Sequence, residues 1–235
     1  MARRPSTWRR FTTATRWPVG IAFTSWRYMW RTTPMHRLEE TGTLEADGPP
    51  PLPGGVSRDD VQGPRDGAGP LFHRRYRTRI RDTELSPAEL IARISSRPDR
   101  AVPTEFATFQ KTVGEQATMR VGDEFVVRMA APWDGPVRVV DKRPESFRLA
   151  TLHDHLEAGQ IEFSAWRDEG LLVFQIESWA RSSTRVVHAL YDGVRMAKEV
   201  QLHMWTSTLE GAVRVSGGRM TGGMDIHTRR VEIDE

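Results

Sequence analysis

The chain has 235 residues, of which 38% are hydrophobic and 28% charged, and this is enough apolar material for one good-sized domain core. No stretch approaches the roughly 18 charge-free apolar residues of a membrane-spanning helix, because Arg27 interrupts the most apolar stretch, Trp17 to Trp30. The sequence contains no Cys and no Asn, which excludes disulfides, thiolate metal sites and N-glycosylation. We therefore expect a cytoplasmic protein.

Residues 1–41 form the first predicted unit, a basic and aromatic N-terminal arm that is partly helical. Residues 1–38 hold eight Arg, four of the eight Trp and no acidic residue, so the remainder of the chain is net negative. Three roles are open for this arm: peripheral contact with an anionic membrane, contact with nucleic acid, or packing against its own acidic domain. Nucleic acid ranks lowest, because the body is acidic and carries no recognition motif.

Residues 42–70 are expected to be a linker, because they hold seven Gly, six Pro and no aromatic residue. After them, Leu71 to Arg81 alternates apolar and polar side chains and predicts a strand. Ser86-Pro87-Ala88-Glu89 predicts a capped helix start, and a second helix is expected after Pro103, burying Phe106, Phe109 and Val113.

Five further strands are expected where short apolar runs alternate with turn sequences, at residues 124–131, 136–141, 146–153, 160–168 and 171–181. Their close spacing predicts an antiparallel meander. Residues 184–213 then place their apolar side chains on one arc, which predicts a long docking helix with His188 and His203 on its solvent face. Residues 215–235 are Gly-rich and predict a flexible tail, with a short strand near residues 225–233.

This order of elements predicts an α+β fold in which a curved antiparallel sheet grips a long C-terminal helix, with two short helices after the first strand. Five segments carry a resemblance: residues 121–127, 133–140 after Pro132, 157–163, 176–182 and 197–205. They are similar to segments of the bacterial DUF-nineteen-ninety family, and the element order resembles the helix-grip fold of the START-like superfamily, which includes the birch pollen allergen and polyketide cyclases. The resemblance covers roughly residues 71–214. It implies relatives that often hold an apolar ligand between helix and sheet, and it supplies no catalytic residue.

Polar residues inside the apolar pattern point to the expected site. Gln201 lies near the centre of the helix's apolar arc, Arg74, Tyr76 and Thr78 share the inward face of the first strand, and Ser178 faces inward from the last. We expect a small apolar or amphipathic ligand, with Gln201 and Tyr76 as polar contacts, in a cavity lined by Tyr76, Met129, Phe147, Leu149, Phe163, Phe174, Ile176, Val194, Gln201 and Met204. The alternative is a packed core in which Gln201 bonds a strand carbonyl and Arg74 reaches solvent.

No strong catalytic motif is present, and neither a metal nor a cofactor is expected. His153, His155 and Glu157 have the side-chain types of a metal site, but their position predicts a surface turn. Two alternative functions stay open. One is a cofactor-independent enzyme of cyclase or hydratase type on the same scaffold, and the other is an interaction or membrane-surface protein that acts through the arm.

Overall fold

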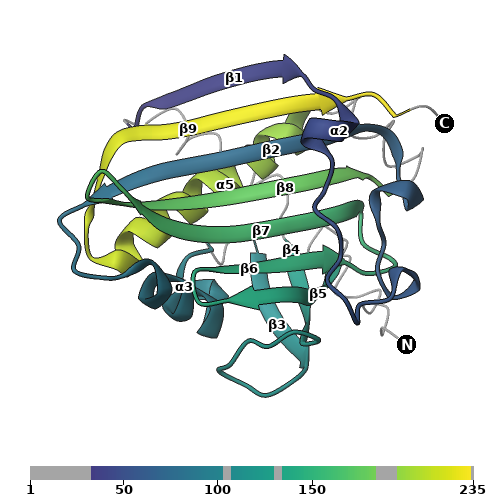
Figure 1. The fold of residues 1–235 in the computed structure, drawn as a ribbon, viewed down its shortest axis with the longest axis horizontal. Coiled ribbons are helices and arrows are strands. Elements are labelled where there is room, and N and C mark those ends of the chain that lie inside the picture. Colours follow the sequence, from purple (N-terminus) through teal and green to yellow (C-terminus); the bar gives the residue numbers. More distant parts are fainter. Residues whose placement is uncertain (1–32, 103–106, 130–133, 184–194, 234–235) are drawn as a thin grey trace, which may run out of the picture.

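The computed structural model describes residues 33–102, 107–129, 134–183 and 195–233, which form a nine-stranded curved sheet with a long helix against one face (Figure 1). The predicted N-terminal helix lies outside the described residues. The elements in chain order are β1 (Met35–Thr41), α2 (Leu44–Asp47), η1 (Arg58–Asp60), η2 (Pro64–Asp66), β2 (Ala68–Arg81), α3 (Pro87–Ser96), η3 (Pro98–Arg100), β3 (Ala107–Val113), β4 (Glu124–Met129), β5 (Asp134–Arg143), β6 (Ser146–Thr151), β7 (Glu157–Asp168), β8 (Leu171–Ser182), α5 (Arg195–Ser216) and β9 (Arg219–Val231).

The strands lie in the order β1-β9-β2-β8-β7-β6-β5-β4-β3. The predicted α+β helix-grip architecture is confirmed, with the meander β4 to β8 and the helix α5 in the expected positions. The sheet is not wholly antiparallel, because β1 pairs with β9 in parallel at one edge. A parallel pair needs a long connection, and here nearly the whole domain separates the two strands in sequence.

The segment after Pro103 is a strand rather than the predicted second helix. Phe106, Phe109 and Val113 have helical spacing, but β3 pairs with β4 as an antiparallel edge strand. The sequence of β3, Ala-Thr-Phe-Gln-Lys-Thr-Val, is rich in β-branched and aromatic residues, which favour strands. Phe109 packs edge-on against Phe125 of β4, with ring centroids 6.3 Å apart. Phe106 lies outside the described residues.

The sheet also extends beyond the predicted 71–214 domain. Residues 35–41, expected in the arm, form β1, and most of the expected tail is β9, which lies between β1 and β2. The glycines that suggested flexibility instead form an irregularity in this strand. Between the pairs Thr78/Met224 and Arg79/Thr221, the strand accommodates Gly222 and Gly223 at φ values of 71° and 81°, which glycine adopts without strain.

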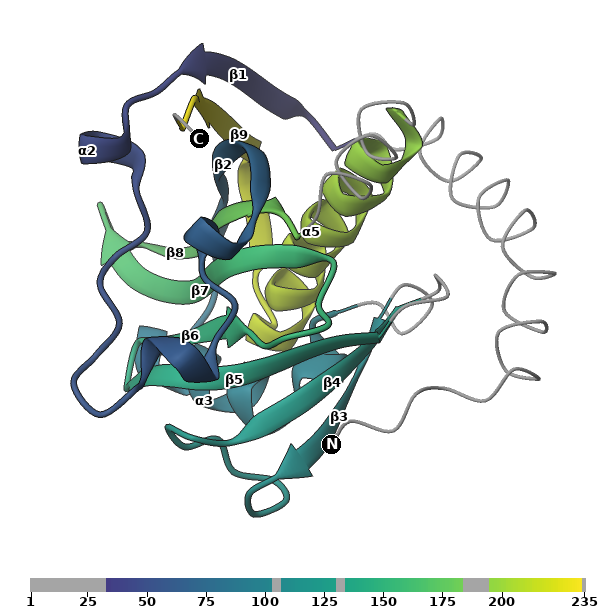
Figure 2. The ribbon, with the colours of Figure 1, turned by 90° about the vertical axis from the view of Figure 1, so that its right-hand side faces the viewer.

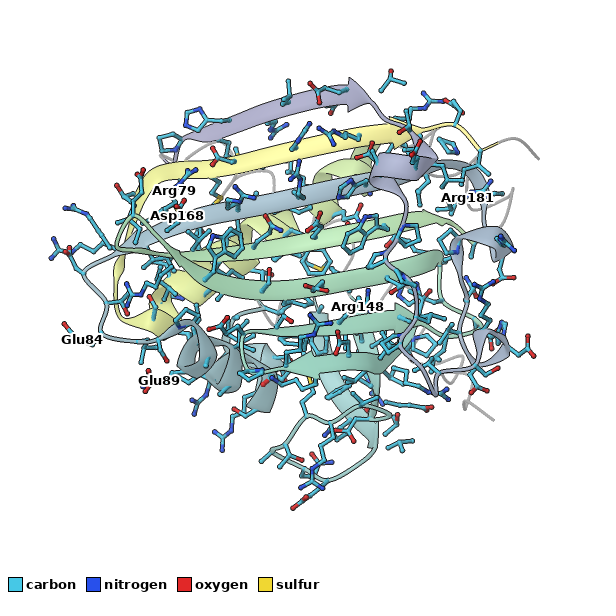
Figure 3. All side chains as sticks on the ribbon, viewed as in Figure 1. Arg79, Glu84, Glu89, Arg148, Asp168 and Arg181 are labelled. Carbon is cyan, nitrogen blue, oxygen red and sulfur yellow. The ribbon has the colours of Figure 1, made fainter. Side chains whose placement is uncertain are left out.

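The predicted linker is a folded strap, defined here as residues 48–66, on the face of the sheet opposite α5 (Figure 2). Its backbone carbonyls accept hydrogen bonds from the sheet: Gln160 Nε2 donates to Pro50 O at 3.1 Å and Arg148 Nη2 donates to Pro51 O at 3.2 Å. Arg148 lies near the middle of this outer face in Figure 3. Val61 of the strap is buried against outward side chains of β5 and β6. The segment is therefore packed on the sheet despite its low hydrophobicity, and the prediction of a linker was wrong here.

A polar clasp, defined here as Asp47, His73, Glu177 and Arg229, fastens α2 to the same outer face. The two ring nitrogens of His73 lie 2.9 Å from Asp47 Oδ1 and 2.6 Å from Glu177 Oε1. Arg229 Nη1 donates to Asp47 Oδ1 at 2.9 Å. Burial by itself raises the pKa of Asp47, but hydrogen bonds from Arg229, His73 and the Thr43 amide outweigh it and lower the pKa to about 2.

The opposite, inner face of the sheet is covered by α5, and the main hydrophobic core lies between them. Gly211 lets this helix approach the backbone, because a Cβ built there lies 1.9 Å from the carbonyl oxygen of Ala101. His203 is 5% exposed rather than on a solvent face as predicted, and His188 lies outside the described residues. The one-sided pattern fails here because Leu202, His203, Trp205, Thr206, Ser207, Thr208 and Leu209 are all buried, so burial surrounds this part of the helix.

We predict that Gly211→Ala destabilises the protein by about 1–3 kcal/mol, although alanine favours helices by about 1 kcal/mol over glycine. The added methyl group must displace either α5 or the backbone at Ala101. Equilibrium urea unfolding measures the loss. Gly54→Ala is the control, because nothing lies within 4 Å of its new Cβ, and its effect should stay within about 0.5 kcal/mol. Equal stabilities of the two variants would contradict the close approach.

We predict that Asp47→Asn costs about 2 kcal/mol at pH 7 and that this cost begins to shrink as the pH falls below about 4. The carboxylate contributes stability above its unfolded pKa and loses it as the pH falls through its lowered folded pKa. Urea unfolding between pH 7 and 3 measures this trend. Asp59→Asn, in the exposed η1 turn, is the control and should show no such pH dependence.

Candidate functional site

Strand register determines which side chains face α5. Successive side chains on a strand alternate between faces, so one row crosses the inner face of four neighbouring strands as Tyr76, Ile176, Phe163 and Phe147. The adjacent row, two residues along each strand, places Arg74 opposite Ser178, and Ser178 opposite Ile161. The inner face therefore carries an aromatic row beside a partly polar one.

The apolar residues predicted to line the site gather in a single core cluster. Phe147 and Phe163 stack with ring centroids 4.7 Å apart, and Trp205 of α5 meets Phe163 edge-on at 6.0 Å. Met204 packs against the cluster and is partly buried. The structure brings these predicted residues together: Tyr76, Phe147, Leu149, Phe163, Phe174, Ile176 and Met204. The side chain of Met129 and all of Val194 lie outside the described residues.

A chain of hydrogen bonds joins three polar side chains across this face. Arg74 Nη1 donates to Gln201 Oε1 at 3.1 Å, and Gln201 Nε2 donates to Glu157 Oε1 at 3.0 Å. A guanidinium only donates and a carboxylate only accepts, so these partners fix the orientation of the Gln201 amide. The same guanidinium lies 4.4 Å from the ring centroid of Phe72. Gln201 thus separates a cation from an acid.

Burial changes the acidity of the groups beside this chain. Burial raises the pKa of the Glu157 carboxyl, and the opposing effects of Arg74 and of the Gln201 hydrogen bond do not cancel it. Burial also raises the pKa of the Tyr76 hydroxyl to about 12, with Arg74 opposing the shift and Glu157 adding to it. At neutral pH the phenol is therefore a hydrogen-bond donor, and the acid is more easily protonated than an exposed glutamate.

Two buried polar atoms at this face lack a hydrogen-bond partner among the described residues: Ser178 Oγ and Trp205 Nε1. Ser178 is 5% exposed and Trp205 is 9% exposed. Trp205 follows Gln201 by four residues, so both side chains lie on the same side of α5. A buried polar group without a partner costs about 1–3 kcal/mol. Two other atoms of this kind in the described residues, Arg148 Nε and Gln160 Oε1, lie on the outer face beneath the strap, so what distinguishes the inner pair is its position beside the polar chain and the aromatic rings.

Sequence reasoning missed the inward position of Glu157. It placed the start of the strand at Gln160 and Glu157 in a surface turn, whereas β7 begins at Glu157. The period of two was available as a signal, because counting back from Phe163 through Ile161 and Gly159 leads to Glu157. Gln62 of the strap holds this strand start, since its Nε2 donates to the carbonyl oxygens of His155 and Glu157 at 3.1 and 3.2 Å.

The two histidines before β7 do not join Glu157 in a site. His153 is exposed, and its Nε2 lies 3.3 Å from the Asp59 carbonyl oxygen. His155 Nδ1 accepts from the Glu157 amide at 2.9 Å, and burial lowers the pKa of His155 to about 4, so its ring is neutral at pH 7. No group of three His, Asp or Glu side chains in the described residues is arranged to hold a metal ion. No helix in those same residues has the length and apolarity to span a membrane.

Comparison with solved structures finds similar folds at low sequence identity. A major latex-like protein 151 from Panax ginseng is 10% identical over 63% of this chain and 99% of its own, with a TM-score of 0.47. A hypothetical protein, jhp0584 from Helicobacter pylori, is 8% identical over 60% and 86%, with a TM-score of 0.45. The di-domain ARO/CYC StfQ from the steffimycin biosynthetic pathway is 11% identical over 66% and 52%, with a TM-score of 0.45.

A comparison with curated proteins found no match. A family model does match, over residues 65–210, which is more than half of the chain and includes β2 through most of α5. Its description is Domain of unknown function (DUF1990), the family that the five sequence segments resemble. The chain therefore belongs to the DUF1990 family.

Proposed function

We propose that the protein binds a small apolar or amphipathic molecule between α5 and the inner face of the sheet. The observation that carries this proposal is the pair of unpartnered buried groups, Ser178 Oγ and Trp205 Nε1, beside an apolar and aromatic surface. A bound molecule that offered them polar atoms would recover a cost that the described residues do not offset. Ligand sites are typically apolar with a few such convergent polar groups.

The polar chain also argues against a fully packed apolar core. In the packed alternative, Gln201 bonds a strand carbonyl and the guanidinium of Arg74 reaches solvent. Instead, Gln201 bonds two side chains, and Arg74 is half-buried with its guanidinium directed to Gln201. These contacts keep three polar side chains at the apolar interface, where they are available to orient a ligand.

We predict that Ser178→Phe lowers the affinity for an uncharged apolar dye, Nile red, at least tenfold, because the new ring occupies the space proposed for the ligand. Fluorescence titration measures the affinity, and circular dichroism checks that the variant folds. Ser164→Phe is the matched control, since Ser164 lies on the outer face of the neighbouring strand β7, opposite Gln175. Unchanged binding in Ser178→Phe, or no binding by the wild type, would contradict the proposed location.

A second candidate function is proton transfer on the bound molecule, as in a cofactor-independent cyclase or hydratase. The observation that favours it is Glu157, a partly buried acid with a raised pKa within the same polar chain. The pKa of a general acid or base works best near the operating pH, and burial moves this carboxyl in that direction. Gln201 would orient the carboxyl, and the Tyr76 hydroxyl is the neighbouring donor.

We predict that Glu157→Gln makes the protein more stable than the wild type at pH 8 and that this difference disappears at pH 4. An acid with a raised folded pKa disfavours the folded state as the pH rises above its unfolded pKa of 4.5, and below that pH both side chains are neutral. The substituted amide keeps an oxygen for the Gln201 hydrogen bond. Urea unfolding at both pH values measures the difference.

The control is Glu84→Gln, at an exposed position labelled in Figure 3, which should not change stability with this pH dependence. A Glu157→Gln variant that is less stable than the wild type at pH 8 would show a net stabilising ionised carboxylate. That result would remove the basis for Glu157 as a proton-transfer group. Functional side chains commonly reduce the stability of the folded state, whereas a carboxylate that stabilises it needs no functional explanation.

A further inference from the structure

The charge balance of the inner face bears on what kind of molecule it binds. Arg74 has five N–H groups, and within the described residues its guanidinium makes a single hydrogen bond, to the neutral amide of Gln201. No carboxylate in those residues comes within ion-pair distance of it. Glu157, the nearest acid in the polar chain, has Gln201 between itself and the cation. Among the described residues, the site therefore holds a partly buried cation that no carboxylate contacts directly, although its charge acts on Glu157.

Neutral donors lie on the same inner face as this cation. Ser178 lies directly opposite Arg74 in the antiparallel pair of β2 and β8, a placement that holds Cβ atoms about 5 Å apart. Its hydroxyl has no hydrogen-bond partner in the part of the chain that the structure describes. Tyr76 is the next inward residue on β2 and is 3% exposed, and its raised pKa keeps the hydroxyl a donor at neutral pH. A third donor, Trp205 Nε1, lies one helical turn beyond Gln201.

The polar groups of this face that remain available to a ligand are therefore mainly hydrogen-bond donors. A guanidinium with free N–H groups pairs best with a carboxylate or a phosphate, often through two parallel hydrogen bonds. Arg74 and a few neutral donors lie beside stacked aromatic rings, so a compact anionic head group on an apolar body fits this face, and a single carboxylate is the simplest such group. Arg37 of the exposed strand β1 is a second cation whose charge acts on the Tyr76 hydroxyl. The half-buried position of Arg74 leaves room for water to solvate part of such a head group.

We infer that the ligand is an amphipathic monocarboxylic acid whose carboxylate pairs with Arg74 and accepts hydrogen bonds from the hydroxyls of Ser178 and Tyr76. Its apolar body then lies along Phe163 and Trp205. This inference rests on the proposed binding function and specifies the ligand class. In this arrangement Gln201 positions the Arg74 side chain, and Arg74 is the main donor to the carboxylate of the ligand.

The experiment compares ligands that differ only in the head group. Dodecanoic acid and 1-dodecanol, each below its aggregation concentration, compete with Nile red for the full-length protein at pH 8. We expect the acid to bind at least tenfold more tightly than the alcohol. Naphthoic acid and naphthalenemethanol form a second pair, which distinguishes a ring-shaped body from an aliphatic chain. A preference for the acid in either pair supports the inference.

Variants assign the preference to Arg74. Arg74→Met should weaken binding of the acid at least tenfold and leave the alcohol unchanged, and Arg74→Lys should restore part of the affinity for the acid. Arg75→Met is the matched control, because Arg75 faces the outer side of the same strand, where its Nη2 lies 3.0 Å from His227 Nδ1. If Arg74→Met does not fold, Ser178→Ala provides the test, with an expected smaller loss confined to the acid.

The outcomes separate the two proposals. If the alcohol binds as tightly as the acid, or Arg74→Met weakens both equally, the carboxylate inference is overturned while the binding function stands. If neither acid, alcohol nor Nile red binds the wild type, the binding function itself fails. If Arg75→Met removes the preference for the acid as fully as Arg74→Met does, general surface charge explains it and the assignment to Arg74 is wrong.

Discussion

The fold depends on α5 covering the inner face of the sheet, where the side chains of each strand alternate between the inner and the outer face. Because every second residue of β2, β7 and β8 must face α5, Arg74, Glu157 and Ser178 enter the same interface as the aromatic side chains. Burial of an aromatic ring there contributes about 1.5–3 kcal/mol, whereas each unpaired polar group costs about 1–3 kcal/mol. An apolar residue at these polar positions would suit stability better, so the polar residues indicate a role other than holding α5 in place.

The outer face of the sheet is covered by the strap rather than by a long helix. It combines polar side chains with two small apolar clusters, and the strap covers part of it with proline-rich backbone whose carbonyls accept hydrogen bonds from Gln160 and Arg148. Proline provides an acceptor and no donor, which suits a surface rich in side-chain N–H groups. The same strap reaches the start of β7 through Gln62. Packing of the strap on the outer face thus helps to hold the strand start from which Glu157 points to the inner face.

Periodicity of apolar residues predicted the meander and the existence of the long helix, and the Ser86–Glu89 spacing predicted the start of α3. It did not predict that α5 is buried on more than one side. It failed where another constraint decided the structure. Gly222 and Gly223 form an irregularity in β9 rather than a flexible tail, and residues 107–113 pair as an edge strand despite helical spacing. In the site, Gln201 was recognisable as polar among apolar residues, whereas Glu157 was assigned to a turn because the strand start was placed three residues late.

The order of groups along the polar chain constrains what the site can do. In a direct ion pair, the charges of Arg74 and Glu157 would compensate each other, and the nearby cation would lower the pKa of the carboxyl and keep it ionised. Placing the Gln201 amide between them leaves each incompletely compensated: the guanidinium retains donors for an anion, and burial favours the protonated acid. One arrangement therefore supports both recognition of a carboxylate and transfer of a proton. Binding requires only the cation and its neighbouring donors, whereas catalysis also requires a reacting atom of the ligand within hydrogen-bond reach of Glu157, which makes binding the more economical explanation of the observed contacts.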